Sequence, residues 1–136
     1  MDLTKTMQIA AAGMAAQSTR LRVVSENLAN ADSTAQVPGG DPYRRKVVTF
    51  RSTLDRALGA ETVQVAGVKP APGEFERRYN PAHPAADKDG YVKMPNVNPL
   101  IEVMDMREAQ RSYQANVSVI DAAKAMIGRT LDILQG

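Results

Sequence analysis

The sequence predicts a mainly α-helical protein with a small β-rich insert, in which long N- and C-terminal helices pack as a coiled-coil-like pair. Three observations support this fold class. Apolar residues recur at helical spacing through both ends of the chain, every proline except Pro99 lies in the middle, and the middle alternates apolar and polar residues as strands do. We therefore divide the 136 residues into an N-terminal axial helix over 1–31, a β-rich insert with an extended loop over 32–98, and a C-terminal axial helix over 99–136.

The N-terminal helix is predicted from apolar residues spaced alternately by four and three. A heptad pattern of this length is typical of a coiled coil or a helix bundle. We expect the helix to end near Asn30, because the Asn, Asp, Ser and Thr side chains there compete for backbone hydrogen bonds. Gln17 is the one polar interruption of the pattern, which otherwise consists of Leu3, Met7, Ala10, Met14, Leu21, Val24, Leu28 and Ala31.

The C-terminal helix is predicted to run from Pro99 to Leu134. Asn98 is a suitable N-cap, and Pro99 is suited to the first helical position. Glu102 and Asp105 place negative charge near the positive end of the helix dipole. At about 1.5 Å per residue the helix is roughly 50 Å long, so it needs partners along its length.

Apolar residues of this second helix also form a stripe, which Gln110 and Lys124 interrupt. The small residues Ala109 and Ala123 lie beside the stripe, so a partner helix can approach closely there. The stripe consists of Val103, Met106, Tyr113, Val117, Ile120, Ile127, Leu131 and Leu134.

Short strands are predicted in the insert. Lys46–Phe50 is rich in β-branched residues, and Glu61–Val68 alternates valines with polar residues, which indicates a half-buried strand. Between these segments we expect one helical turn that contains Leu54 and Leu58. The segment 69–98 is rich in Pro, Gly and Asp, and predicts an irregular arm in which 75–79 and 90–94 are short extended pieces.

The insert holds too few apolar residues to cover both helical stripes. We therefore expect part of each stripe to be buried against other molecules, and a free monomer to have partly disordered terminal helices. A self-contained two-helix hairpin is the alternative that the pattern leaves open. The candidate subunit-packing residues are Met7, Met14, Leu21, Val24, Leu28, Tyr113, Val117, Ile120, Ile127, Leu131 and Leu134.

Residues suited to catalysis or cofactor binding are scarce in the sequence. There is no cysteine, and His83 is the only histidine, so we predict no metal, no cofactor and no enzymatic activity. We interpret His83 as a loop residue that packs or caps a turn; a hydrolase centred on it is the weakest hypothesis. The segment Asp87–Gly90 resembles the start of a calcium loop, but Gly90 follows Asp89 directly, so we predict a tight turn.

The charge pattern leaves a nucleic-acid-binding module open as an alternative function. The formal net charge is only +2, but Arg44, Arg45 and Lys46 follow Tyr43 in one basic cluster. A second cluster places two arginines between Phe75 and Tyr79. We favour a solvated strand edge, or a surface that pairs with acidic groups of a neighbouring subunit. No segment predicts a cleaved signal peptide or a membrane span.

Three segments together resemble the bacterial flagellar axial proteins, the rod, hook and hook-associated components. The stretch Ser25–Ser33 resembles the motif that ends their first helix, Pro42–Phe50 resembles the segment that follows, and Glu108–Leu134 resembles their closing helix. Within that family the expanded loop before Tyr43 and the run through Asp89–Asn98 are similar to the proximal-rod type. The motif residues that carry the resemblance are Asn27, Leu28, Ala29, Asn30, Tyr43, Arg44, Tyr113, Gln114, Ala115 and Asn116.

The resemblance implies a structural subunit of the proximal rod of the flagellar basal body, the helical drive shaft that transmits motor torque. It further implies export by the flagellar type III apparatus without a cleaved signal, and assembly in the periplasm. The implied partners are copies of the chain, other rod subunits, the membrane ring and the export-gate adaptor, with no nucleic acid and no small-molecule substrate. In such assemblies the terminal helices are expected to form an inner layer.

Overall fold

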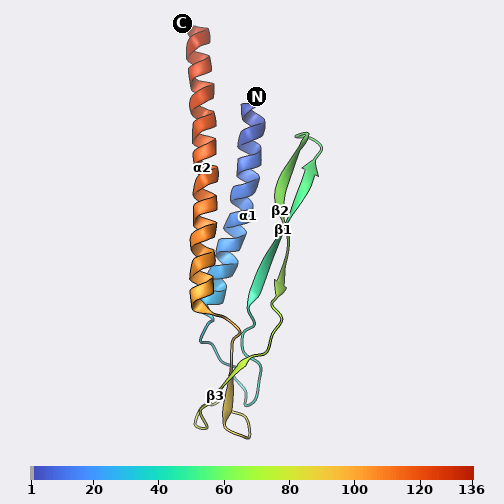
Figure 1. The fold of residues 1–136 in the computed structure, drawn as a ribbon, viewed down its shortest axis with the longest axis vertical. Helices are drawn as coiled ribbons and strands as arrows, with labels where there is room; N and C mark the ends of the chain where they lie inside the picture. Colours follow the sequence, from blue (N-terminus) through green and yellow to red (C-terminus); the bar gives the residue numbers. More distant parts are fainter. Residues whose placement is uncertain (1) are drawn as a thin grey trace. The chain divides into compact units, whose positions relative to one another are not determined.

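The computed structural model describes residues 2–136. Its elements follow one another as α1 (Leu3–Ala29), β1 (Lys46–Asp55), β2 (Ala60–Pro70), β3 (Glu76–Tyr79), β4 (Tyr91–Met94) and α2 (Pro99–Gln135). The strands form two sheets of two strands each, β1 with β2 and β3 with β4. The predicted fold class is therefore confirmed: one long helix precedes and another follows a small β-rich insert in the chain (Figure 1).

The chain forms two compact units. Unit 1 comprises residues 1–21, 48–67 and 107–136, and unit 2 comprises residues 22–47 and 68–106. Unit 1 thus contains most of α1, most of the β1–β2 hairpin and most of α2. Unit 2 contains the last turns of α1, the first turns of α2, the loop between α1 and β1, and the β3–β4 hairpin.

Helix α2 begins at Pro99, where the sequence predicts, and α1 ends at Ala29, next to the predicted end near Asn30. The Asn98 Oδ1 accepts a hydrogen bond from the Leu100 N–H at 3.1 Å, which is the predicted N-cap of α2. At the start of α1 the Asp2 Oδ1 accepts from the Lys5 N–H at 3.1 Å. These caps satisfy amide groups that have no partner within the helix.

The β1–β2 hairpin departs from the prediction at its tip. The expected helical turn is wrong, because Leu54 lies in β1 and Leu58 lies in the connecting turn. The Asp55 Oδ1 accepts hydrogen bonds from the N–H groups of Ala57 and Leu58, and Gly59 has a φ of +66°. This Asx turn outcompetes a single helical turn, whose nucleation is costly.

The β3–β4 hairpin confirms the two short extended segments expected in the arm. The strands are antiparallel, with Tyr79 opposite Tyr91 and the two rings edge to face at 5.3 Å between centroids. A small core of Ala85, Val92 and Met94 lies under this hairpin. It is too small to stabilise much structure on its own.

The tight turn predicted at Asp87–Gly90 is confirmed. The Asp87 Oδ1 accepts hydrogen bonds from the N–H groups of Asp89 and Tyr91, and Gly90 has a φ of +84°. The bond from the Tyr91 amide is the largest cause that lowers the pKa of Asp87; the hydrogen bond from Arg77 at 2.9 Å lowers it further. The carboxylate is therefore engaged in the turn and with Arg77.

Candidate functional site

The two helices contact each other through small and polar residues. In unit 1, a Cβ added at Gly13 would lie 2.7 Å from the Asn116 Nδ2, and Arg20 forms a 3.2 Å ion pair with Glu108. In unit 2, the Asn27 Nδ2 donates to the Glu102 Oε2 at 3.2 Å. The α1 residues of these three contacts are seven apart in sequence, so they lie on one face of the helix.

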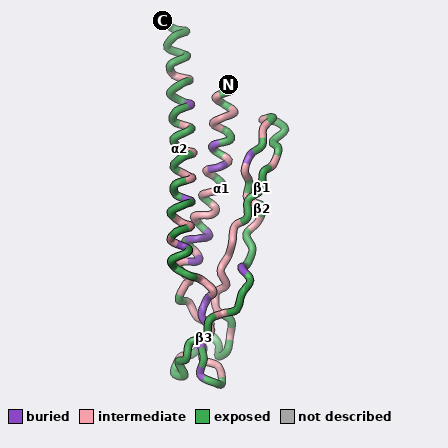
Figure 2. Tube along the Cα trace, in the orientation of Figure 1, coloured by how far each residue is buried: buried purple, intermediate pink, exposed green. Residues whose placement is uncertain are grey.

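We call this face of α1, with its counterpart on α2, the contact seam. On α2 the seam positions are also seven apart: Glu102, Ala109, Asn116 and Ala123. Ala109 is fully buried and Ala123 is 3% exposed, which is the burial that the expected close approach at these two alanines requires. Glu102, Ala109 and Ala123 are the buried positions of α2, and the rest of the helix is half-buried or exposed (Figure 2).

The contact seam is displaced by one residue from the apolar stripe of α1. Met14, Leu21 and Leu28 each follow a seam residue directly, and one residue turns an α-helix by roughly 100°. Small residues at the seam allow the helix backbones to come close. The large apolar side chains are therefore left beside the seam.

The structure places the predicted subunit-packing residues at different degrees of burial. Val24 is buried, whereas Leu131 is 51% and Leu134 is 77% exposed. In unit 1, α2 continues beyond the N-terminal end of α1 (Figure 1), and both leucines belong to the last turns of α2. The half-buried members are Met7, Met14, Leu21, Leu28, Tyr113, Val117, Ile120 and Ile127.

A buried polar cluster in unit 2 joins the helices to the insert. We call it the polar lock; it consists of Asn27, Tyr43, Arg45, Lys46 and Glu102. Asn27 and Glu102 are both fully buried, and a buried polar group is costly unless it is hydrogen-bonded. Asn27 and Glu102 both form hydrogen bonds with residues outside their own helix.

Asn27 is the centre of the polar lock. Its Nδ2 donates to the Lys46 carbonyl at 2.9 Å as well as to Glu102. Its Oδ1 accepts from the Tyr43 hydroxyl at 2.7 Å and from the Lys46 N–H at 3.0 Å. One amide side chain thereby makes four hydrogen bonds and fixes where β1 begins against α1 and α2.

Glu102 is neutralised by Arg45. The Arg45 Nε donates to the Glu102 Oε1, and the same guanidinium lies 3.5 Å from the Asp105 carboxylate. Arg45 also fixes its own backbone, because its N–H donates to the Asn96 Oδ1 at 2.7 Å and its carbonyl accepts from the Ala71 N–H. A buried carboxylate is tolerated when it is paired in this way.

Tyr43 is kept protonated by its surroundings. Burial raises the pKa of the Tyr43 hydroxyl, and the carboxylates of Glu26 and Glu102 raise it further. Below its raised pKa the phenol keeps the proton that it donates to Asn27. The hydrogen bond therefore persists above the pH at which a free tyrosine ionises.

The other motif residues lie outside the polar lock. The Arg44 Nη1 donates to the carbonyls of Ala71 and Gly73, and its guanidinium lies 4.3 Å from the centre of the Phe75 ring. Asn30 donates to the Glu26 carbonyl at 2.8 Å. Of the remainder, Leu28 and Tyr113 are half-buried, Asn116 is at the seam, and Ala29, Gln114 and Ala115 are exposed.

The basic cluster proposed for nucleic acid is occupied within the chain. Arg44 contacts carbonyls and a ring, Arg45 pairs with Glu102, and the Lys46 Nζ lies 2.6 Å from the Glu26 Oε1. A nucleic-acid surface needs such cations free to meet phosphates. These three cations instead connect the start of β1 to α1, to α2 and to the segment after β2.

His83 caps a turn, as predicted. Its Nδ1 accepts a hydrogen bond from the Ala85 N–H at 3.0 Å. Between residues 2 and 136 no three His, Asp or Glu side chains are grouped closely enough to hold a metal ion. Over the same residues, neither helix is both long and apolar enough to cross a membrane.

Sequence reasoning missed three members of the polar lock. It relates Glu102 only to the helix dipole, and Arg45 and Lys46 only to a basic cluster and a strand. The contact between Arg45 and Glu102 is the hardest of these to foresee. Their contact joins residues 57 apart in the chain, and nothing local marks it. The one signal was the heptad spacing of Glu102 with Ala109 and Ala123, which places this charged residue on the face where the helices meet.

Comparisons with known proteins identify the family. A family described as "Flagella basal body rod protein" matches residues 7–35, and "Flagellar basal body rod FlgEFG protein C-terminal" matches residues 88–133. The chain is 53% identical over 133 residues to the flagellar basal-body rod protein FlgC of Agrobacterium fabrum, covering 98% of this chain and 96% of that protein.

More distant relatives match over the same extent. FlgC of Salmonella typhimurium is 44% identical over 137 residues, covering 99% of this chain and 100% of that protein. FlgC of Borreliella burgdorferi is 38% identical over an alignment of 154 residues, which covers 100% of this chain and 100% of that protein. The chain therefore belongs to the FlgC family of flagellar basal-body rod proteins.

Proposed function

We propose that this protein is a structural subunit of the flagellar basal-body rod that assembles through the apolar residues its own fold leaves uncovered. One observation carries the proposal. The contact seam uses small and polar residues, while large side chains such as Ile120 and Leu131 remain half-buried or exposed. Apolar surface of this kind marks a protein interface.

The partners we propose are copies of the chain and other rod subunits, since the relatives are named as basal-body rod proteins. The role is mechanical and not enzymatic: the rod transmits motor torque through the packed terminal helices. Contacts with the membrane ring and the export-gate adaptor, a position in the proximal rod across the periplasm, and export without a cleaved signal complete the proposal. We further propose that 1–31, 32–98 and 99–136 act as axial helix, outer insert and axial helix.

The test replaces apolar residues of α2 with aspartate in a flagellated bacterium that depends on this chain. Ile120→Asp with Ile127→Asp should abolish incorporation into basal bodies and motility, because each charge would be buried without a partner. Both isoleucines are half-buried within the chain, so this variant also strains the monomer. A second variant, Val119→Asp with Met126→Asp, changes residues that are 41% and 49% exposed, so we expect its monomer to remain folded.

The matched control is Ser118→Asp with Thr130→Asp, which adds the same charge to exposed polar positions of the same helix that lie outside the stripe and the motif. It should retain more incorporation and motility than either apolar pair. Circular dichroism of the purified chains reports whether each variant is folded. Wild-type incorporation and motility of both apolar pairs would contradict the proposal.

A further inference from the structure

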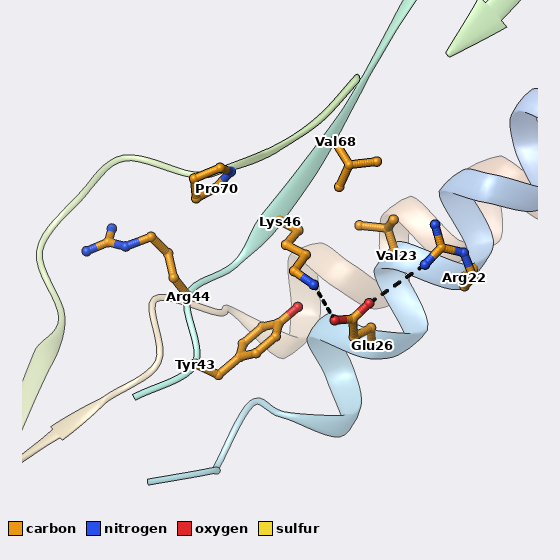
Figure 3. A pocket seen from close by; sticks show the side chains of 8 residues that line it. All are labelled: Arg22, Val23, Glu26, Tyr43, Arg44, Lys46, Val68 and Pro70. Atoms are coloured by element: carbon orange, nitrogen blue, oxygen red, sulfur yellow. Dashed lines mark hydrogen bonds and ion pairs between the residues drawn. The ribbon is translucent and has the colours of Figure 1, made fainter. Parts of the chain in front are cut away.

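A pocket of about 690 Å³ opens in unit 2 beside the polar lock. It lies where the end of α1, the segment before β1 and the end of β2 come together (Figure 3). Val23, Val68 and Pro70 supply apolar walls, and Val68 is 39% exposed although it is a large apolar residue. The pocket therefore offers apolar surface that the chain itself does not cover.

Cations dominate the charged residues around this pocket. Arg22 and Lys46 lie beside the single carboxylate of Glu26, while the third lining cation, Arg44, points its guanidinium away toward the carbonyls of Ala71 and Gly73 (Figure 3). Lys46 lies 2.6 Å from that carboxylate, and Arg22 lies 4.0 Å from it (Figure 3). The Arg22 side chain is 67% exposed, which leaves it able to meet a further acid.

The end of α2 has the complementary character. Leu131, Ile133 and Leu134 are 51%, 80% and 77% exposed, so this turn lacks apolar cover within its own chain. Asp132 is the only charged side chain after Arg129. An acid among three large aliphatic residues fits a pocket with apolar walls and excess positive charge.

We propose that the pocket receives the last turn of α2 from a second copy of this chain, with Leu134 against Val68 and Asp132 opposite Arg22. The inference rests on the proposed function, and it names one contact within the assembly. Two different surfaces meet in this contact, so it is heterologous. A heterologous contact that does not close into a ring repeats from copy to copy and builds a filament, as a rod requires.

The absence of cysteine makes the contact testable by disulfide formation. Two full-length variants, Val68→Cys and Leu134→Cys, are given different tags and expressed together in a flagellated bacterium, and isolated basal bodies are oxidised. A disulfide needs Cα atoms within roughly 7 Å, so a covalent dimer carrying both tags is expected. Either variant expressed alone should give no dimer.

The control pairs Val68→Cys with Met104→Cys, a residue that is also on α2 and 63% exposed. The inference is overturned if Val68→Cys and Leu134→Cys both enter basal bodies and form no disulfide with each other, which is the result expected if another protein fills the pocket. It is also overturned if the control pair cross-links equally well. In either case the proposed function stands. Absence of the wild-type chain from basal bodies would overturn the proposed function and this inference together.

Discussion

At the scale of single residues, the Asn27 side chain fixes the position of the start of β1 relative to α1 and α2 in unit 2. Its side chain makes four hydrogen bonds, to Tyr43, to both backbone groups of Lys46, and to Glu102. All four form at a fully buried position, where water cannot replace a lost partner. Asn27 therefore acts as a structural hub between α1, α2 and β1.

Replacing this hub should be costly. Asn27→Ala leaves the Lys46 N–H, the Tyr43 hydroxyl and Glu102 each short of a partner, and should lower the free energy of unfolding by about 2–3 kcal/mol. Gln114→Ala, at an exposed position of α2, is the control and should change it by less than about 0.5 kcal/mol. Urea unfolding followed by circular dichroism measures both, and equal effects would show that the polar lock contributes no stability.

Residue roles were only partly predictable from the sequence. Asn27 and Tyr43 were singled out as motif residues, but no local pattern shows that the two side chains are hydrogen-bonded to each other. Glu102 was placed correctly in the first turn of α2, where a carboxylate also suits the helix dipole. The burial of Glu102 could not be predicted from the helix dipole, because it depends on pairing with Arg45, which is 57 residues away in the chain.

At the scale of elements, the main difference between sequence and structure is the position of the contact seam on α1, which lies one residue away from the predicted apolar stripe. Helix limits, the N-cap at Asn98 and the two short strands of the arm followed from local signals. The heptad pattern indicates apolar surface, but it does not say which molecule covers that surface. The two helices come close where Gly13 meets Asn116, and the large apolar residues of α1 lie beside that face.

The β1–β2 hairpin shows how turn chemistry can override apolar spacing. Leu54 and Leu58 have the spacing of one helical turn, yet Asp55 and Gly59 between and after them form an Asx turn that ends β1. One helical turn adds few hydrogen bonds for the residues that it orders. The Asp55 side chain supplies those bonds without that cost.

Two glycines of the helices should respond differently to alanine. Gly128→Ala meets no atom within 4 Å, so in the isolated chain it should stabilise α2 by roughly 0.5–1 kcal/mol through helix propensity. Gly13→Ala brings its new Cβ to 2.7 Å from the Asn116 amide, which must move, so the gain should be absent or reversed. Thermal unfolding of the two variants measures the difference, and equal stabilisation would contradict a close helix approach at Gly13.

At the scale of the whole molecule, each unit buries little apolar surface of its own. The buried apolar residues are mostly alanines and valines, whereas Leu100, Met104, Ile133 and Leu134 are exposed. Small side chains hold the helices together, and the proposed function assigns the large ones to contacts with other subunits. This division of roles suits a protein whose final packing is reached only in an assembly.

Imaging of intact basal bodies at side-chain resolution tests this division of roles most directly. We predict that the contacts of Gly13 with Asn116 and of Asn27 with Glu102 persist in the rod, while Ile120, Ile127, Leu131 and Leu134 are covered by neighbouring subunits. The account would be contradicted if those four side chains faced solvent in the assembled rod, or if α1 and α2 separated and paired instead with helices of other subunits.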